Sequence, residues 1–179
     1  MNDKLTHTWS KGLDYDSEVE RLQALVAAHN GKPKGYFAIL LTQLVQSLRI
    51  SEAVDALMKW AKAKKNTDLV QIRVRKRKDV YWRDVYIPKS ILDNSRSIKR
   101  ILNKFEFSDN LVGRVRKFAS YHLYNSHALR HAGITKQGDM GIPDQVIAVG
   151  TGHKKVEHIR IYTQREAARK VLKEMSIRA

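Results

Sequence analysis

The stretch that decides the fold and chemistry of this chain lies between residues 127 and 162. It contains three short segments, which read His127-Ala128-Leu129-Arg130-His131, Gly152-His153 and Ile161-Tyr162-Thr163. An arginine, histidines and a tyrosine in this order suit the attack of a phenol oxygen on a phosphodiester. A second arginine stands far upstream, in Leu48-Arg49-Ile50-Ser51-Glu52-Ala53. We expect phosphodiester chemistry if the fold brings Arg49 to the same pocket.

The charge of the chain favours a polyanionic partner. Its 179 residues include 34 Lys and Arg against 18 Asp and Glu, a formal charge of +16. Such an excess of basic residues usually indicates binding to nucleic acid, although a basic protein without catalysis would show it too. Hydrophobic residues make up 42% of the chain, which is enough for the core of one domain. Charge therefore predicts a nucleic-acid partner but does not single out an enzyme.

No cysteine occurs, so disulfides and thiolate metal sites are excluded. The longest apolar runs, 36–45 and 142–149, are far shorter than the roughly 20 residues of a membrane span. The first residues are polar and include acids, and they do not resemble a signal peptide. We expect a cytoplasmic, DNA-associated protein that makes no membrane contact.

Hydrophobic periodicity predicts a mostly α-helical domain with one small antiparallel sheet, an α+β class. Residues 1–16 are polar and irregular, and residues 17–179 are assigned to the domain. The first three helices are expected at about 17–29, 35–48 and 51–61, with Ser17 and Ser51 as N-caps. Strands are expected at 69–75 and 80–87, joined by the basic turn Lys76-Arg77-Lys78-Asp79. Later helices are expected at about 89–105, 108–121, 127–138, 143–150 and 164–176.

Two arginines suit a phosphodiester because each planar guanidinium makes paired hydrogen bonds to phosphate and balances charge that grows in the transition state. Arg49 and Arg130 are the candidates. A tyrosine, once placed and activated, can hold the DNA as a covalent ester. A lysine on a basic hairpin can protonate the leaving oxygen, and histidines can move protons or contact the phosphate.

These segments resemble the C-terminal boxes of the tyrosine recombinase (phage integrase) family. That family's pattern is His-x-x-Arg-His, then Gly-His, then a tyrosine nine residues after that histidine. Here Arg130 and His153 are 23 residues apart, and His153 and Tyr162 are nine apart. The segment around Arg49 resembles the family's first box, Gly-Leu-Arg-Ile-Ser-Glu. The resemblance covers residues 30–176 and implies the family's helical catalytic domain.

The resemblance implies six catalytic residues, which are Arg49, Lys78, His127, Arg130, His153 and Tyr162. Tyr162 would attack the scissile phosphate, form a 3′-phosphotyrosyl bond and free a 5′-hydroxyl. Arg49 and Arg130 would clamp the nonbridging oxygens. His127 and His153 would complete the phosphate site and assist proton transfer. The resemblance implies no cofactor or metal, because the phosphotyrosine ester stores the energy needed for rejoining.

The general acid is assigned to the basic turn. Lys78 stands five residues before Arg83, and the family often reads Lys-Gly-x-Lys-x-Arg before a strand like Arg83-Asp84-Val85-Tyr86-Ile87-Pro88. Lys76 is the alternative, because alternation could place both lysines on one face of the strand. The resemblance also implies that Glu52 orients Arg49.

The chain departs from the family pattern at three places. Ser47 stands where the first box usually has Gly, and Thr151 stands where a Leu commonly precedes Gly152. Neither change removes a catalytic group. Family members also carry a helical DNA-binding domain before the catalytic one, and only about 30 residues precede the match here. We expect either a catalytic fragment or a minimal protein that grips DNA weakly.

Simpler explanations exist for single residues. Arg49 could interact with a helix end, and Tyr162 could belong to the core. His127 and His131 lie four apart and could bind a metal, but no third ligand has a matching spacing. His131 is therefore expected to be structural.

The expected partners are double-stranded DNA and further copies of the chain, assembled on DNA as a tetrameric synapse. The apolar stripe of the helix at 164–176 would pack on its own domain or on a neighbouring subunit. Two other functions remain open. One is a DNA-relaxing enzyme like the type IB topoisomerases, and the other is a catalytically idle DNA-binding module with a steep salt dependence.

Overall fold

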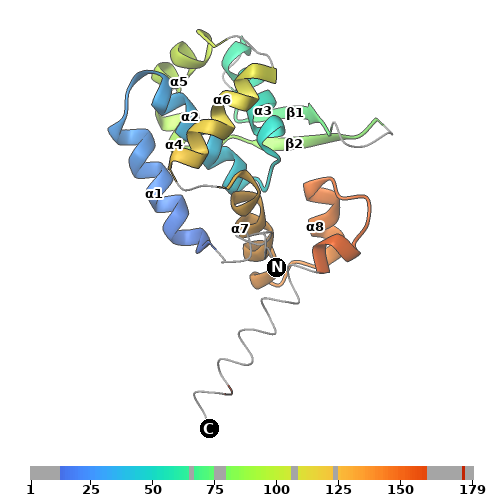
Figure 1. Ribbon diagram of the computed structural model, residues 1–179. Helices are drawn as coiled ribbons and strands as arrows, with labels where there is room; N and C mark the ends of the chain where they lie inside the picture. The colour runs from blue at the N-terminus through green and yellow to red at the C-terminus, as the bar shows by residue number, and fades with distance from the viewer. Residues whose placement is uncertain are drawn as a thin grey trace, which may run out of the picture.

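Helices make up most of the computed structural model, which describes residues 13–64, 67–74, 80–105, 109–122, 125–160 and Met175. Three helices precede a two-stranded sheet and five follow it within these residues (Figure 1). In chain order the elements are α1 (Tyr15–Ala28), α2 (Gly31–Val45), α3 (Ile50–Lys62), β1 (Leu69–Arg73), β2 (Trp82–Tyr86), α4 (Lys89–Asp93), α5 (Ser95–Leu102), α6 (Asp109–Tyr121), α7 (Ser126–Asp139) and α8 (Asp144–Thr151). The predicted mostly α class with one small antiparallel sheet is confirmed.

Helix α2 forms the centre of the fold. Its residues 37–44 are buried all round, as expected for a helix that is apolar on nearly every side. Helices α1, α3, α5, α6 and α7 all contact it. Within the described ranges no single helix is long and apolar enough to cross a membrane; the pair α2 and α3, bent by 116°, passes that test by length and composition alone.

The hairpin follows the predicted alternation. Strand β1 pairs antiparallel with β2, and Ile72 lies opposite Arg83 in the register. On β2 the side chains of Arg83 and Val85 are buried, whereas Trp82 and Tyr86 are exposed. The buried side faces α3, which contacts β1. The turn residues 75–79, with Lys76 and Lys78, lie outside the described residues.

Helix α8 stands apart from the main core, beside the hairpin (Figure 1). A second, smaller hydrophobic cluster joins α8 to α7 and contains Ile134, Ile147, Ala148 and Ile159. The hairpin is tied to the same helix, because the Tyr81 hydroxyl donates to the Val149 carbonyl at 2.8 Å. The segment after α8 is thereby held close to both α7 and the hairpin.

Several boundaries differ from the sequence prediction. Helix α1 begins at Tyr15 because the Asp14 carboxylate accepts from the Ser17 N–H at 2.8 Å, so that Asp14 and not Ser17 is the N-cap. Helix α2 begins at Gly31, since Pro33 falls in the first turn, where a missing N–H costs no hydrogen bond. The predicted helix at 89–105 is divided at Asn94 into α4 and α5. The predicted helix at 164–176 lies outside the described residues, apart from Met175.

Candidate active site

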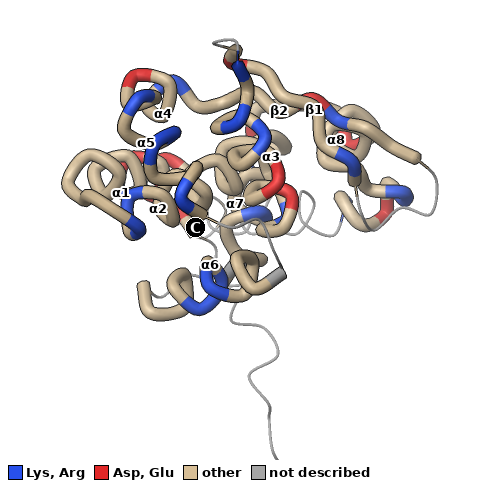
Figure 2. Tube along the Cα trace, turned by 90° about the horizontal axis from the view of Figure 1, so that it is seen from above, with Lys and Arg blue, Asp and Glu red and all other residues tan. Residues whose placement is uncertain are grey.

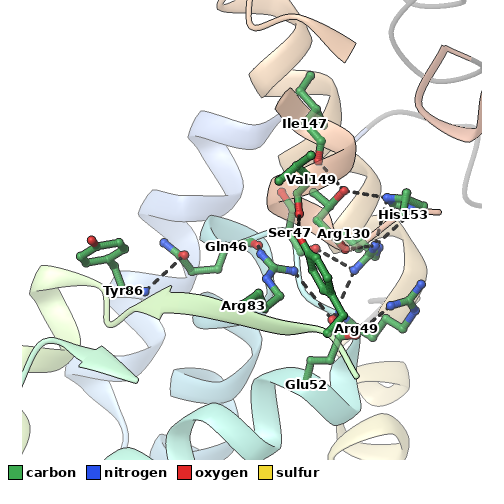
Figure 3. A network of polar contacts seen from close by, with 12 residues as sticks. Gln46, Ser47, Arg49, Glu52, Arg83, Tyr86, Arg130, Ile147, Val149 and His153 are labelled. Carbon is green, nitrogen blue, oxygen red and sulfur yellow. Dashed lines mark hydrogen bonds and ion pairs between the residues drawn. The ribbon is translucent and has the colours of Figure 1, made fainter. Parts of the chain in front are cut away.

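Three arginines from distant parts of the chain converge on one buried carboxylate, that of Glu52 (Figure 3). Arg49 Nη1 lies 2.7 Å from Glu52 Oε1. Arg130 Nη1 and Arg83 Nη1 lie 3.5 and 3.8 Å from Oε2. The Glu52 side chain is 1% exposed, so these ion pairs form away from water, where removing one partner is costly.

The start of α3 places Arg49 and Glu52 side by side. The helix begins at Ile50, so Arg49 occupies the N-cap position that was predicted for Ser51. Glu52 is the third helical residue, and its carboxylate accepts from the Arg49 backbone N–H at 3.0 Å. This is the reciprocal bond of a capping box, and the helix dipole favours a carboxylate at this end. The same carboxylate that caps the helix therefore orients the Arg49 side chain, as the resemblance implies.

Two backbone carbonyls fix the guanidinium of Arg130. Its Nη1 donates to the Ser47 carbonyl and its Nη2 to the Thr151 carbonyl, both at 2.9 Å. These carbonyls belong to the α2–α3 turn and to the last residue of α8. Arg130 is thus held where α7, the α2–α3 turn and the end of α8 meet. Its position depends on how α7 packs against that turn and against α8.

Ser47 and Gly133 set the approach of α7 to the α2–α3 turn. Ser47 has a φ of 50°, a left-handed conformation that favours glycine, which explains why Gly is usual here in the family pattern. A hydrogen bond stabilises the serine in this conformation, because its Oγ accepts from Gln137 Nε2 at 2.8 Å. A Cβ added at Gly133 would lie 2.4 Å from both Leu44 O and Ser47 Oγ. The close approach therefore requires glycine on α7.

The Gly152-His153 segment turns His153 toward Arg130. Gly152 ends α8 with a φ of 70°, and a Cβ there would lie 3.0 Å from the buried Val74 side chain. After this turn, His153 Nδ1 lies 2.6 Å from Thr151 Oγ1, and Arg130 Nη2 lies 3.4 and 3.3 Å from Nδ1 and Nε2. Burial, and then the charges of Arg130 and Arg49, lower the pKa of His153 to about 3. His153 is therefore neutral at physiological pH.

His127 and His131 lie one turn apart on α7. His127 is exposed in the first turn of the helix, three residues before Arg130, and its ring centroid is 6.4 Å from that of His131. Burial and the charges of His127 and Arg130 lower the pKa of His131 to about 4. Among the described residues no group of three or more His, Cys, Asp or Glu could hold a metal ion.

The structure thus brings together Arg49, Arg130 and His153, and it places His127 on the same helix as Arg130. Lys78 and Tyr162 lie outside the described residues, so their positions stay predictions. One member of the cluster, Arg83, was not predicted as a site residue. It donates to the Gln46 carbonyl at 2.8 Å, and burial lowers its pKa while Glu52 opposes that shift. Its signal in the sequence is an arginine at a buried position of the alternating strand.

The cluster is suited to an anionic ligand. Three guanidinium groups share one carboxylate, which leaves a net positive charge within this network. Arg49 is the most accessible of the three, with 21% of its side chain exposed against 7% for Arg83 and 5% for Arg130. A phosphate arriving from solvent would meet Arg49 at the surface and Arg130 and His153 behind it.

Known proteins resemble the chain in sequence, although no protein-family model matches it. The uncharacterized protein MJ0770 of Methanocaldococcus jannaschii is 31% identical over 201 residues, covering 95% of this chain and 90% of that protein. "Putative integrase ORF241" of Acidianus two-tailed virus is 31% identical over 181 residues, covering 97% of this chain and 71% of that protein. "Putative integrase V10" of Sputnik virophage is also 31% identical, over 153 residues.

The fold is that of tyrosine recombinases. The XerH site-specific recombinase, solved with its palindromic difH substrate, has a TM-score of 0.58 at 19% identity; the match covers 92% of this chain and 52% of XerH. The Tn1549 transposon integrase, solved with transposon right end DNA, has a TM-score of 0.54 at 14% identity over 90% of this chain and 66% of that chain. The present chain thus spans about half of the XerH chain and two thirds of the Tn1549 one. Together with the integrase relatives, these matches show that the chain belongs to the tyrosine recombinase (integrase) family.

Proposed function

We propose that this chain is a site-specific DNA recombinase of the integrase type, which cleaves and rejoins double-stranded DNA through a tyrosine. The observation that carries the proposal is the pairing of Arg49 and Arg130 with Glu52 and the contact of Arg130 with His153. Arg49, Arg130 and His153 are three of the six side chains that the family pattern assigns to the reaction, and they come from three separate segments. The integrase relatives and the recombinase fold support the same function.

The proposed reaction exchanges one phosphodiester for another. The Tyr162 hydroxyl passes its proton to one of the two histidines that the family pattern assigns to proton transfer, His127 or His153. Its oxygen forms a bond to the scissile phosphorus, while the bond from phosphorus to the 5′ oxygen breaks. Lys78, or Lys76 in its place, protonates that leaving oxygen to give a 5′-hydroxyl. Arg49 and Arg130 balance the charge on the nonbridging oxygens. Attack by a 5′-hydroxyl on the phosphotyrosine reverses the steps and rejoins the DNA.

The surface fits a DNA partner. Lys and Arg lie on several sides of the described chain, including α5 and α6 (Figure 2), and the chain carries a formal charge of +16. Neutralising phosphates releases counterions, so we expect binding that weakens steeply with salt.

The proposal also includes three further features. They are a single catalytic domain at 17–179, assembly of four copies on DNA as a tetrameric synapse, and a cytoplasmic location.

The decisive experiment traps the covalent intermediate. The target sequence is unknown, so a library of nicked duplexes with random sequence is incubated with the protein, and adducts are separated on a denaturing gel. Religation is blocked in such a substrate, because the short fragment that carries the 5′-hydroxyl diffuses away. We expect adduct with the unmodified chain and with Tyr121→Phe, whose tyrosine is exposed on α6, and none with Tyr162→Phe. An adduct formed by Tyr162→Phe would show that another group is the nucleophile.

Two outcomes point to the other functions. Relaxation of supercoiled DNA without any sequence preference among the trapped duplexes would indicate a topoisomerase-like enzyme. Salt-dependent binding of duplex DNA without any covalent species would indicate an idle DNA-binding module. Sequencing of the trapped duplexes distinguishes a site-specific enzyme, because its adducts share one sequence.

A further inference from the structure

Thr151 is the residue at which this chain departs from the family pattern next to a catalytic histidine. Its side chain is buried, and its hydroxyl oxygen lies between two polar groups. Thr151 Oγ1 is 2.6 Å from the carbonyl oxygen of Ile147 and 2.6 Å from His153 Nδ1. Both are short hydrogen bonds, and they share a hydroxyl that has a single proton.

The chemistry of the two neighbours decides where that proton lies. A carbonyl oxygen can only accept, so the Thr151 hydroxyl must donate to Ile147, as the short distance requires. The hydroxyl can then only accept from His153, which places a proton on Nδ1. In the opposite arrangement the Ile147 carbonyl and the Thr151 hydroxyl oxygen would face each other at 2.6 Å without a proton between them.

Arg130 lies beside the ring without choosing between its two nitrogens. A guanidinium only donates, and Arg130 Nη2, which donates to the Thr151 carbonyl, lies 3.4 Å from His153 Nδ1 and 3.3 Å from Nε2. When Nδ1 carries the proton, the Nε2 lone pair can accept the second N–H of Arg130 Nη2. The two 2.6 Å contacts of the Thr151 hydroxyl are satisfied together only when Nδ1 carries the proton.

We propose that the Thr151 hydroxyl is a positioning group that holds His153 in the tautomer protonated on Nδ1, with Nε2 as an acceptor beside Arg130. A neutral Nε2 lone pair accepts a proton and does not donate a hydrogen bond to phosphate. The neighbouring charges of Arg130, Arg49 and Arg83 oppose a second proton on the ring, and His158 adds to their effect. His153 therefore stays neutral in the free protein, and the Thr151 hydroxyl fixes which nitrogen carries its proton. Any effect of this tautomer on catalysis rests on the proposed function, whereas the tautomer itself does not.

The tautomer is measured on the free protein, without DNA. Long-range ¹H–¹⁵N correlation spectra distinguish the two neutral forms of histidine, and comparison with His153→Gln identifies the His153 signals among the seven histidines. We expect the Nδ1–H pattern in the unmodified chain and in Thr151→Ser, which keeps the hydroxyl. Thr151→Val has a similar shape without the hydroxyl, and we expect the ratio of Nδ1–H to Nε2–H to fall about fivefold, as for the loss of one hydrogen bond.

Three results would overturn the proposal: an Nε2–H pattern in the unmodified chain, an unchanged ratio in Thr151→Val, or an equal shift in Thr151→Ser. The signals of the other histidines report whether each variant keeps its fold. The catalytic role is tested separately with the duplex that yields adduct. There Thr151→Val should slow adduct formation, by at most the same factor of about five, at unchanged affinity for DNA, and Thr151→Ser should not. No adduct from the unmodified chain would refute the recombinase function and leave the tautomer result standing.

Discussion

Gly133 on α7 lies so close to Ser47 in the α2–α3 turn that a Cβ at position 133 would come within 2.4 Å of Ser47 Oγ. The two residues are 86 positions apart in the sequence. Their contact brings α7 to the Ser47 carbonyl, which accepts from Arg130 at 2.9 Å. The position of one arginine of the candidate site thus depends on the absence of a single methyl group.

Gly133→Ala should destabilise the protein by about 1–3 kcal/mol, the usual cost of overpacking. The new methyl group meets the Leu44 carbonyl as well as Ser47, so relief requires α7 to move. Gly113→Ala is the matched control, because its Cβ would meet nothing within 4 Å on α6. That change should stabilise by about 0.5–1 kcal/mol, since alanine is the better helix former. Urea unfolding measures both; equal effects would contradict the close approach.

Glu52→Gln should destabilise the protein by about 3–5 kcal/mol. The substitution keeps the shape of the side chain but removes the charge that Arg49, Arg83 and Arg130 share. Glu20→Gln makes the same chemical change at an exposed position of α1 and should alter stability by less than about 0.5 kcal/mol. Denaturant unfolding compares the two variants. A small effect at Glu52 would mean that the three arginines do not depend on its charge.

Two replacements of Ser47 should differ in their effect on the stability of the protein. Ser47→Ala keeps the left-handed backbone and loses the bond from Gln137, so it should destabilise by about 1 kcal/mol. Ser47→Gly loses the same bond but relieves about 1 kcal/mol of backbone strain, and should remain close to the unmodified chain. Thermal or urea unfolding of the two variants gives the order. A glycine variant less stable than the alanine variant would show that the turn carries no such strain.

Stability should fall as the pH falls below about 6.5, because two histidines are held neutral in the fold. Burial lowers the pKa of His131 to about 4 and that of His153 to about 3. The unfolded chain, with histidine pKa values near 6.5, binds more protons between about pH 6.5 and 4. The free energy of unfolding therefore decreases with decreasing pH throughout this window.

Urea unfolding at several pH values between 7 and 5 tests this directly. His131→Gln and His153→Gln should each make the pH dependence less steep. Gly113→Ala on α6 serves as the control, since it changes no titratable group, and should leave the slope unchanged. A slope that neither buried-site variant alters would assign the acid sensitivity to other groups.

Local patterns predicted much of the fold. The alternation of residues 80–87 predicted β2, and the helix predicted at 35–48 corresponds to the buried, largely apolar α2. Both depend on residues a few positions apart, which a sequence displays directly. The boundaries at Tyr15, Gly31 and Asn94 were missed because competing capping and turn residues lie next to one another there.

Some residues of the candidate site were predicted and others were missed, for a related reason. Arg130 and His153 stand at a spacing that matches the family pattern, and Arg49 lies in a segment that resembles its first box. The structure brings the three together. Arg83 was missed because a lone arginine in a strand shows no partner in sequence, and its carboxylate is 31 residues away. Ser47 and Thr151 looked like simple departures from the pattern, yet their carbonyls hold Arg130.

The sequence by itself determined the helical class, the order and spacing of the segments that carry the candidate site residues, and their likeness to tyrosine recombinases. Only the tertiary structure decided that one carboxylate serves three arginines, that α7 needs glycine at 133, and that His153 meets the Thr151 hydroxyl. The physical reason is distance along the chain. Periodicity and capping act over a few residues, whereas these contacts join segments up to 86 positions apart, and only the packing of the helices around α2 brings them within reach.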